Sequence, residues 1–425
     1  MNVSLNPSVP NGIIQAISSK SAAHRILICA AFADKPTVIR CDRTNKDISA
    51  TADCLRAMGA CIEYREPNFY VRPIGTPKTN ISLNCNESGS TLRFLLPVVS
   101  ALGISAKFVM QGRLPSRPLS PLYEELVGHG ATISQMGKNP LKCSGKLVGE
   151  EYRIRGDVSS QYISGLLFAL TFSGEGGRLI IEGKMESASY VDMTVDALRI
   201  FGAQPQKTDY GYSIQKGAHL TSPSSIDVEG DWSNAAFPLC MGAIGNGSVT
   251  VCGLSQISRQ GDAKIVHLLR EFGADVCVSG NEYTAKGGKP LHGIDIDASQ
   301  IPDLVPVLAV VAAVSQGKTV IHGAARLRLK ESDRIESVCS MLSTLGATVE
   351  ATDDGLVIHG KSHLNGSTVD SFNDHRIAMS AAVASVACKG CVTVNGAECV
   401  EKSYPDFWND MEEYLSLNIK KNIEK

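Results

Sequence analysis

Three segments of the chain place cations and hydroxyl groups where a helix is predicted to begin. They are KSAAHR at 20–25, SSQ at 159–161 and DHR at 374–376. The start of a helix exposes unpaired N–H groups and carries about half a unit of positive charge, so it attracts anions. Arginine adds a planar fork that fits phosphate or carboxylate. The three segments therefore predict binding of small phosphorylated or carboxylated ligands.

Further charged residues lie at other predicted helix starts. Asp303 precedes an apolar helix, and Glu331 lies among the cations that are predicted to begin a second set of helices. For each residue alone a structural interpretation stays open, because Asp231 and Asp303 would be good N-caps and Glu331 a favourable first-turn acid. The collection as a whole favours a ligand site. Its cations outside the first three segments are Arg117, Lys330, Arg334 and Lys402.

A long repeat organises these segments. Five helices are predicted to end in a glycine C-cap, and those glycines, at 59, 130, 202, 273 and 346, are 71, 72, 71 and 73 residues apart. In the same phase, six Ala-rich apolar helices each precede a short strand, and these segments begin at residues 19, 87, 159, 231, 301 and 373. The sequence thus predicts six modules of helix, strand, helix and two further strands.

Modules of this length exceed the roughly 20–50 residues of common solenoid repeats, so we predict two α/β domains of three modules each. The Ala-rich helices have no polar face over much of their length and should be buried in the middle of each domain. We expect their N-termini to meet at the domain interface, which would gather the polar segments there.

Composition limits the kinds of partner. The 41 Lys and Arg nearly balance the 43 Asp and Glu, without blocks of one sign, so bulk electrostatic binding to nucleic acid or a membrane surface is not expected. The longest apolar stretch, 304–314, is too short to span a bilayer, and the first residues lack the features of a signal peptide. We expect a cytoplasmic monomer with small-molecule ligands.

Two short motifs suggest other chemistry and are interpreted as structural. GLVIHGKS at 355–362 matches the P-loop pattern, but it alternates like a strand and no helix is predicted after it. A nucleotide-binding repeat protein remains the alternative that this motif would support. Thirteen cysteines without a secretory signal predict reduced thiols, and the lone CxxC at 388–391 has no second pair, so no metal is expected.

Motifs along the whole chain resemble the EPSP synthase family, the 3-phosphoshikimate 1-carboxyvinyltransferases. The resemblance implies two inside-out α/β domains, each of three βαβαββ modules with buried central helices. Residues 19–229 would form one domain and 1–18 with 230–425 the other, joined by two crossovers. The motifs are SKSxxxR (19–25), GSTLRFLLP (89–97), RPLSPL (117–122), DVSSQYISGLLFAL (157–170), IPD (301–303), RLRLKESDR (326–334), NDHRIAM (373–379) and KSYPDFW (402–408).

The resemblance also implies transfer of the enolpyruvyl group of phosphoenolpyruvate to the 5-hydroxyl of shikimate 3-phosphate, without a cofactor. Asp303 would be the base for the hydroxyl, Glu331 the acid for the methylene, and Lys20 a third catalytic residue. Shikimate 3-phosphate would be bound by Lys20, Ser21, Arg25, Ser159, Ser160, Gln161, Ser187, Asp303 and Lys330. Phosphoenolpyruvate would be bound by Lys20, Gly89, Arg117, Gln161, Arg334, Arg376 and Lys402.

The chain departs from the family pattern at Glu87 and Arg326, where relatives often have asparagine, and at SASY (187–190) in place of SKPY. The alternative within the same fold is UDP-N-acetylglucosamine enolpyruvyl transferase. That enzyme normally carries a reactive Cys or Asp in the loop that here reads QGRLPSRPL (111–119), and no cysteine lies between Cys85 and Cys143. The absence of this cysteine favours the EPSP synthase family over the UDP-N-acetylglucosamine enzyme.

Overall fold

The computed structural model describes residues 1–135 and 137–422, which divide into two compact units. Unit 2 is Ser18–Val228, and unit 1 combines Met1–Ile17 with Glu229–Lys425. Each unit contains three four-stranded sheets. Within the described ranges, every helix is too short or too polar to cross a lipid bilayer.

All six sheets share one topology, in which a parallel pair of strands is extended by two antiparallel strands. In unit 2 the sheet orders are β14 (Ser225–Asp227), β3 (Thr37–Arg40), β5 (Asn68–Arg72), β4 (Cys61–Arg65); β6 (Ile81–Asn86), β7 (Ala106–Met110), β9 (Leu141–Ser144), β8 (Thr132–Ile133); and β10 (Glu151–Arg155), β11 (Gly177–Glu182), β13 (Gly211–Ile214), β12 (Gln206–Thr208).

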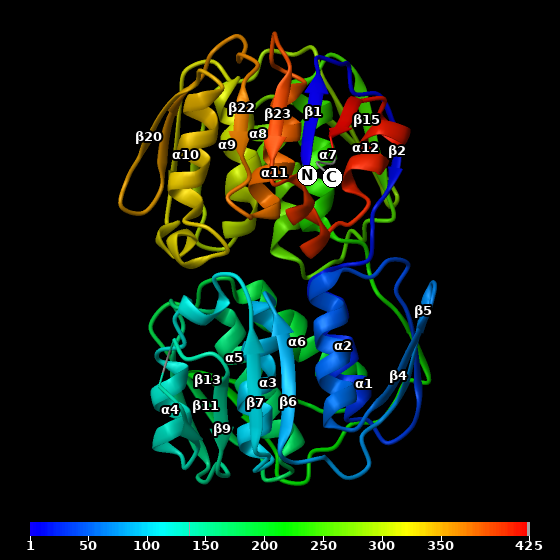
Figure 1. Cartoon of the computed structure of the whole chain (residues 1–425), viewed down its shortest axis with the longest axis vertical. Helices are drawn as coiled ribbons and strands as arrows, with labels where there is room; N and C mark the ends of the chain where they lie inside the picture. The colour runs from blue at the N-terminus through cyan, green and yellow to red at the C-terminus, as the bar shows by residue number, and fades with distance from the viewer. Residues whose placement is uncertain (136, 423–425) are drawn as a thin grey trace. The chain divides into compact units, whose positions relative to one another are not determined.

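Unit 1 repeats this topology and draws on both ends of the chain. Strand β1 lies beside β23 (Figure 1), and β24 pairs with the other side of β1, so that these two strands take the place of the hairpin in the other sheets. Its sheet orders are β2 (Gly12–Gln15), β15 (Ser248–Cys252), β17 (Glu282–Lys286), β16 (Asp275–Ser279); β18 (Asp295–Asp297), β19 (Lys318–His322), β21 (Leu356–His359), β20 (Thr348–Ala351); and β22 (Thr368–Asp370), β23 (Val392–Asn395), β1 (Asn2–Asn6), β24 (Asn418–Asn422).

The chain passes from one unit to the other twice. The strand just before each passage completes a sheet of the unit that the chain is leaving. Strand β2 precedes the first helix of unit 2 but pairs in parallel with β15 of unit 1. Conversely, β14 precedes the first helix of unit 1 but pairs in parallel with β3 of unit 2. The first parallel strand of each of these two sheets therefore comes from a distant part of the chain.

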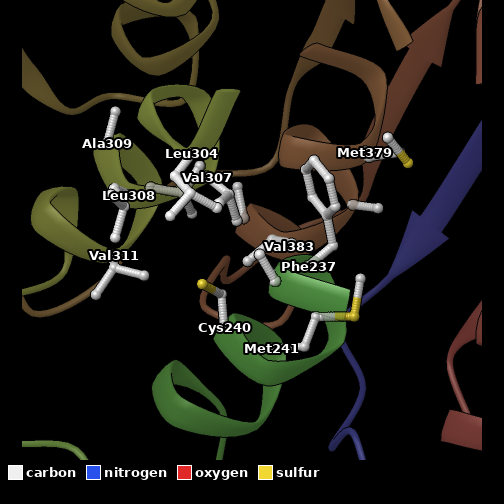
Figure 2. Close-up of a cluster of buried hydrophobic side chains, with 14 of the residues drawn as sticks. Phe237, Cys240, Met241, Leu304, Val307, Leu308, Ala309, Val311, Met379 and Val383 are labelled. Carbon is white, nitrogen blue, oxygen red and sulfur yellow. The ribbon is translucent and has the colours of Figure 1, made fainter. Parts of the chain in front are cut away.

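The Ala-rich segments form the buried central helices that the sequence predicts. In unit 1 the three central helices pack on one another, and Figure 2 shows Phe237, Val307 and Met379 in their common core. All nine residues of α9 are buried, as expected for a helix without a polar face. The central helices are α1 (Lys20–Ala31), α3 (Gly89–Ala101) and α5 (Ser160–Phe172) in unit 2, and α7 (Trp232–Ile244), α9 (Val305–Ala313) and α11 (His375–Ser385) in unit 1.

The outer helices carry the predicted glycine signal at their ends. All five glycines have positive φ, from 82° at Gly346 to 121° at Gly59, a conformation that side chains with a Cβ disfavour. The prediction of five glycine-terminated helices is confirmed. The outer helices are α2 (Lys46–Met58), α4 (Leu122–Gly128), α6 (Ala188–Ile200), α8 (Ile265–Glu271), α10 (Arg334–Thr344) and α12 (Phe407–Leu415).

The P-loop match belongs to a sheet. Residues 356–359 form β21, which pairs with β19 and β20, and no helix follows before β22. A strand that is paired on both sides cannot wrap a triphosphate. The interpretation of this motif as a strand is therefore confirmed.

One local prediction is wrong. Arg117, Lys330 and Lys402 do not begin the second helices, since α4, α10 and α12 start four or more residues later. Each cation instead ends a short 3-10 helix that follows a strand, so the three occupy one equivalent position of the module. These 3-10 helices are η1 (Leu114–Ser116), η4 (Ala325–Leu329) and η5 (Ala397–Lys402); two further ones are η2 (Gly261–Lys264) and η3 (Pro302–Leu304).

Candidate active site

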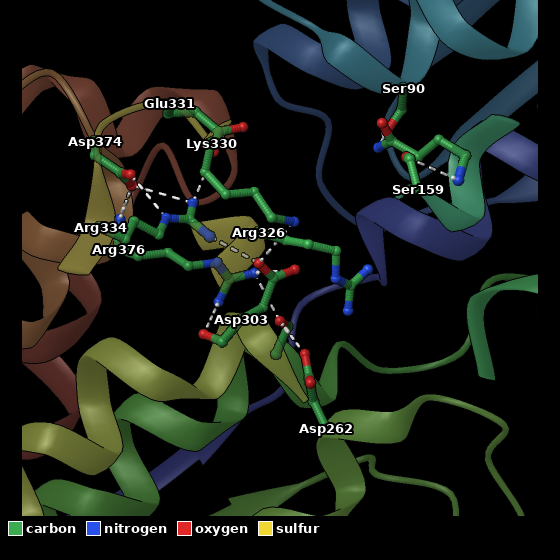
Figure 3. Close-up of polar contacts among 12 residues, drawn as sticks. Ser90, Ser159, Asp262, Asp303, Arg326, Lys330, Glu331, Arg334, Asp374 and Arg376 are labelled. Atoms are coloured by element: carbon green, nitrogen blue, oxygen red, sulfur yellow. Dashed lines mark hydrogen bonds and ion pairs between the residues drawn. The ribbon is translucent and has the colours of Figure 1, made fainter. Parts of the chain in front are cut away.

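Arg334 is the centre of a buried ion cluster in unit 1 (Figure 3). Its side chain is almost fully buried, and its guanidinium binds three carboxylates from different segments. Nη1 lies 2.7 Å from Asp303 Oδ1, Nη2 lies 2.9 Å from Glu331 Oε2, and Nε lies 2.8 Å from Asp374 Oδ2. Burial alone would lower the pKa of Arg334, but the three carboxylates raise it, so the guanidinium stays charged.

Asp303 is the carboxylate that the cations share. Besides Arg334, Lys330 Nζ lies 3.7 Å from its Oδ1 and Arg376 Nη2 lies 3.5 Å from its Oδ2. Burial would raise the pKa of Asp303, but Arg376, Lys330 and Arg334 together hold it well below its usual range. Asp303 is therefore ionised. It lies inside η3 rather than at a helix cap, because the N-cap of α9 is Leu304, so the capping interpretation of Asp303 is wrong.

The surroundings of Lys330 lower the pKa of its ammonium group. Burial, opposed by Asp303 and reinforced by Arg334, lowers its pKa to about 8. An amine with this pKa changes charge close to neutral pH, whereas an exposed lysine does not. The charge of Lys330 therefore falls as pH rises through about 8.

Arg376 connects Asp303 to a second buried carboxylate. Its Nη2 donates to Ser233 Oγ at 2.7 Å, and the Ser233 hydroxyl donates to Asp262. Burial, together with the nearby charge of Asp303, raises the pKa of Asp262 to about 6. Asp231 is the N-cap of α7, as predicted, because its carboxylate accepts from Asn234 N at 2.7 Å.

Lys402 is buried near the start of α11. Its ammonium donates to the Asn373 carbonyl oxygen at 2.5 Å, one residue before Asp374, which caps α11 by accepting from Arg376 N at 3.0 Å. The structure therefore brings five predicted residues, Asp303, Lys330, Glu331, Arg334 and Arg376, into direct contact, and places Lys402 beside the same helix start.

In unit 2, Arg25 ties α1 to two other helices. Its side chain is 3% exposed and donates to the carbonyl oxygens of Ser21 and Tyr190 at 2.7 and 2.8 Å. Its Nε donates to Thr194 Oγ1, which in turn donates to Ser164 Oγ of α5, both at 2.8 Å. Burial lowers the pKa of Arg25 to about 10, which still leaves it charged at neutral pH.

Lys20 is the first residue of α1 and forms an ion pair with Asp47 at 2.9 Å. Ser159 caps α5 by accepting from Gln161 N, and Ser160 is the first residue of that helix. Ser187 precedes α6 in the left-handed conformation, with φ of 51°. These predicted residues thus stand at three helix starts of one unit.

Gly89 begins α3 where two guanidinium groups converge. A Cβ on Gly89 would lie 2.5 Å from Arg93 Nη1 and 2.9 Å from Arg117 Nη1. The Gln161 amide donates to Ser90 Oγ at 2.9 Å and accepts from Arg93 Nη1 at 3.4 Å. A Cβ at position 89 would therefore force the guanidinium ends of Arg93 and Arg117 to shift.

Some residues around these clusters were not predicted. Asp262 and Thr194 carry no sequence signal beyond their polarity, whereas Asp374 stands at a predicted helix start but its partner Arg334 is 40 residues away. Of the departures from the family pattern, Arg326 donates to the Ser299 carbonyl oxygen at 2.8 Å. The Glu87 carboxylate packs against Gly112, where a side chain would collide with it.

The described residues also bear on metal binding. Within 1–135 and 137–422, no three His, Cys, Asp or Glu side chains are grouped so that they could hold a metal ion. All thirteen cysteines are free thiols. The charged groups that could bind a ligand in both units are thus arginine and lysine, whose natural partners are phosphate and carboxylate.

The fold defines the class of protein. An EPSP synthase from Acinetobacter baumannii superimposes with a TM-score of 0.79 and 27% identity, over 99% of this chain and all of that one. The enolpyruvyl transferase NikO from Streptomyces tendae gives a TM-score of 0.78 at 19% identity, over 100% of this chain and 99% of that one, a likeness of fold alone. The predicted enolpyruvyl transferase fold, with two α/β domains of repeated modules, is confirmed.

Sequence comparison then assigns the family. The model of the EPSP synthase family (3-phosphoshikimate 1-carboxyvinyltransferase) matches residues 6–411. A 3-phosphoshikimate 1-carboxyvinyltransferase of Clostridium kluyveri is 42% identical over 412 residues, covering 96% of each chain. One of Clostridium acetobutylicum is 41% identical over 418 residues, covering 97% of this chain and 96% of the relative. The chain belongs to the EPSP synthase family, as the resemblance predicted.

Proposed function

We propose that this protein transfers the enolpyruvyl group of phosphoenolpyruvate to the 5-hydroxyl of shikimate 3-phosphate and releases phosphate. The family assignment supports this reaction over transfer to UDP-N-acetylglucosamine. Among the contacts of the molecule, the observation that carries the proposal is the sharing of the Asp303 carboxylate by Arg334, Lys330 and Arg376. This arrangement supports Asp303 as the proposed base, because the cations beside it could bind an anionic substrate.

Asp303 is proposed to accept the proton of the 5-hydroxyl as that oxygen attacks the central carbon of phosphoenolpyruvate. Glu331, in its protonated form, is proposed to deliver a proton to the methylene carbon in the same step. The resulting tetrahedral adduct then loses phosphate, and a proton leaves its methyl group to restore the double bond. The two proton transfers need one acid and one base whose surroundings differ. Both proposed groups contact Arg334, and Asp303 also lies near Lys330 and Arg376.

The remaining predicted residues are proposed as anion-binding groups. Arg334, Arg376, Arg117, Lys402, Lys20, Gln161 and Gly89 are assigned to phosphoenolpyruvate. Ser21, Arg25, Ser159, Ser160, Ser187 and Lys330, with Lys20, Gln161 and Asp303, are assigned to shikimate 3-phosphate. Fixed positive groups would stabilise the charge that develops on the leaving phosphate without a metal ion.

A phosphate-release assay with alternative acceptors tests the function. Phosphate should be released from phosphoenolpyruvate with shikimate 3-phosphate and not with UDP-N-acetylglucosamine. Release with the nucleotide sugar alone would refute the assignment. Calorimetry with ATP addresses the nucleotide-binding alternative, for which no binding is expected.

Two variants test the roles of the carboxylates. Asp303→Asn keeps the shape of the side chain but removes its charge and one acceptor oxygen, and with them the proposed base, and we expect kcat to fall at least 100-fold. Glu331→Gln should likewise lower kcat with little change in KM for shikimate 3-phosphate. Wild-type turnover in Asp303→Asn would remove the base assignment. We further propose a cytoplasmic monomer, and light scattering coupled to size-exclusion chromatography tests the oligomeric state.

A further inference from the structure

A chain of buried hydrogen bonds runs between three helices of unit 2. His24 Nδ1 lies 2.7 Å from Thr51 Oγ1, Thr51 Oγ1 lies 2.6 Å from Thr91 Oγ1, and Thr91 Oγ1 donates to Ser88 Oγ at 2.8 Å. The four side chains are at most 1% exposed. They belong to α1, α2, α3 and the N-cap of α3, in that order. We call this set the His24–Ser88 relay.

The bonds fix where each proton lies. Thr91 gives its hydroxyl proton to Ser88, so its oxygen must accept from Thr51, and Thr51 must then accept from His24. Nδ1 of His24 therefore carries a proton. Nε2 is buried and has no hydrogen-bond partner among the described residues, which fits an unprotonated nitrogen. Burial, with the charges of Lys20 and Arg25, lowers the pKa of His24 well below its usual range, so the ring is neutral.

The relay joins two segments with different proposed ligands. At one end, His24 lies next to Arg25 of α1, a residue assigned to shikimate 3-phosphate, and its ring meets Phe94 edge-on. At the other end, Ser88 caps α3 and immediately precedes Gly89, on which Arg93 and Arg117 converge. A shift of Ser88 would move Gly89 relative to both guanidinium groups.

We infer that His24, Thr51 and Thr91 are positioning residues that hold the start of α3 in the geometry that phosphoenolpyruvate binding requires. The inference rests on the proposed function, which assigns Gly89 and Arg117 to that substrate. Such a buried polar chain orients its members only when every bond is made, because a missing partner leaves a buried polar atom unsatisfied.

Replacement of Thr51 tests the relay, since valine matches the shape of threonine but lacks the hydroxyl. Thr51→Val should raise KM for phosphoenolpyruvate about tenfold while KM for shikimate 3-phosphate stays within twofold. Thr51→Ser, which keeps the hydroxyl, should restore KM for phosphoenolpyruvate to within twofold of the wild type. The matched control is Thr171→Val, which removes another buried hydroxyl bond in unit 2, to Leu167 O at 2.8 Å, outside the relay.

Thr171→Val should lower the melting temperature and leave both KM values unchanged. The inference is overturned if Thr51→Val behaves like this control, if serine fails to rescue, or if both KM values rise together. Should Thr51→Val not fold, His24→Asn and His24→Leu provide the same comparison, because asparagine can donate an N–H to Thr51 and leucine cannot.

Nitrogen-15 NMR of histidine-labelled wild-type protein tests the relay without any assay of turnover. The shifts of His24 at pH 7 should be those of a neutral ring protonated at Nδ1. A ring protonated at Nε2, or at both nitrogens, would overturn the assigned direction. If the wild type releases no phosphate with shikimate 3-phosphate, the proposed function fails, while the NMR result still decides whether the relay exists.

Discussion

Replacing Arg334 by methionine should destabilise unit 1 strongly and in a pH-dependent manner. The guanidinium is almost fully buried and makes four contacts within 3.2 Å with the carboxylates of Asp303, Glu331 and Asp374. Removing one partner of a buried ion pair costs about 3–5 kcal/mol. Because Arg334 serves three carboxylates, we expect about 5 kcal/mol at pH 7.5, a large part of the roughly 5–15 kcal/mol typical of a folded protein.

The pH dependence follows from the carboxylates. Although burial opposes it, nearby cations lower the pKa values of Asp303 and Asp374, and Arg334 contacts both carboxylates. Their stabilising contribution is therefore present above the unfolded pKa of about 3.9 and is lost as pH falls through the lower folded values. Without Arg334, burial should raise these pKa values, so the loss of stability should be smaller at pH 5 than at pH 7.5.

Urea titration followed by tryptophan fluorescence measures this loss in one unit. Both tryptophans, Trp232 and Trp408, belong to unit 1. The matched control is Lys289→Met, since Lys289 Nζ lies 3.3 Å from Asp275 Oδ2 in the same unit but is largely exposed. Such an exposed pair is worth about 0–1 kcal/mol. A loss for Arg334→Met that equals the control, or that does not change between pH 5 and 7.5, would refute the reasoning.

Three further outcomes are expected. Because Lys330 has a pKa of about 8 and is charged below it, kcat/KM for shikimate 3-phosphate should fall above pH 8, and Lys330→Arg should shift that fall beyond pH 9.5. The pKa of Asp262 is raised to about 6, so the folded protein holds this proton more tightly than the unfolded chain does, and the resulting stabilisation is lost as pH rises through 6. Asp262→Asn should therefore stabilise unit 1 by about 1–3 kcal/mol at pH 8 but not at pH 4, as measured by urea titration. Gly346→Val should cost about 1–3 kcal/mol in the same assay, because φ is 82° and its Cβ would lie 2.6 Å from Asn365 Nδ2, while both KM values stay unchanged.

The modular fold could be predicted because its signals are local and repeated. An apolar, Ala-rich run identifies each central helix, and a glycine with positive φ ends five outer helices. Strand pairing between distant segments could not be predicted in this way. Nothing in residues 12–15 indicates pairing with β15, more than 230 residues later, nor does the composition of β1 indicate β24 as its neighbour.

The candidate site was predictable as a collection of residue types, and its contacts were not. Sequence reasoning singled out Glu331 and Arg334, and Asp374 as part of a helix start, but it could not show that Asp374 accepts two bonds from Arg334 across 40 residues of the chain. The sequence also predicts a helix start at Lys330, whereas Lys330 ends η4 and α10 begins at Arg334. In the structure Arg328 instead donates to the Thr352 carbonyl oxygen, a tertiary contact that fixes a 3-10 turn.

The charges of the cluster set a condition for the proposed role of Asp303 as the base. Arg334, Lys330 and Arg376 hold the pKa of Asp303 well below its usual range, which makes its carboxylate a weak proton acceptor. A phosphate or carboxylate that binds Arg376 and Lys330 would neutralise part of this positive charge and raise the pKa of Asp303 toward the operating pH. The same cations would then serve binding and catalysis in turn, because arrival of the anion is what makes the carboxylate basic.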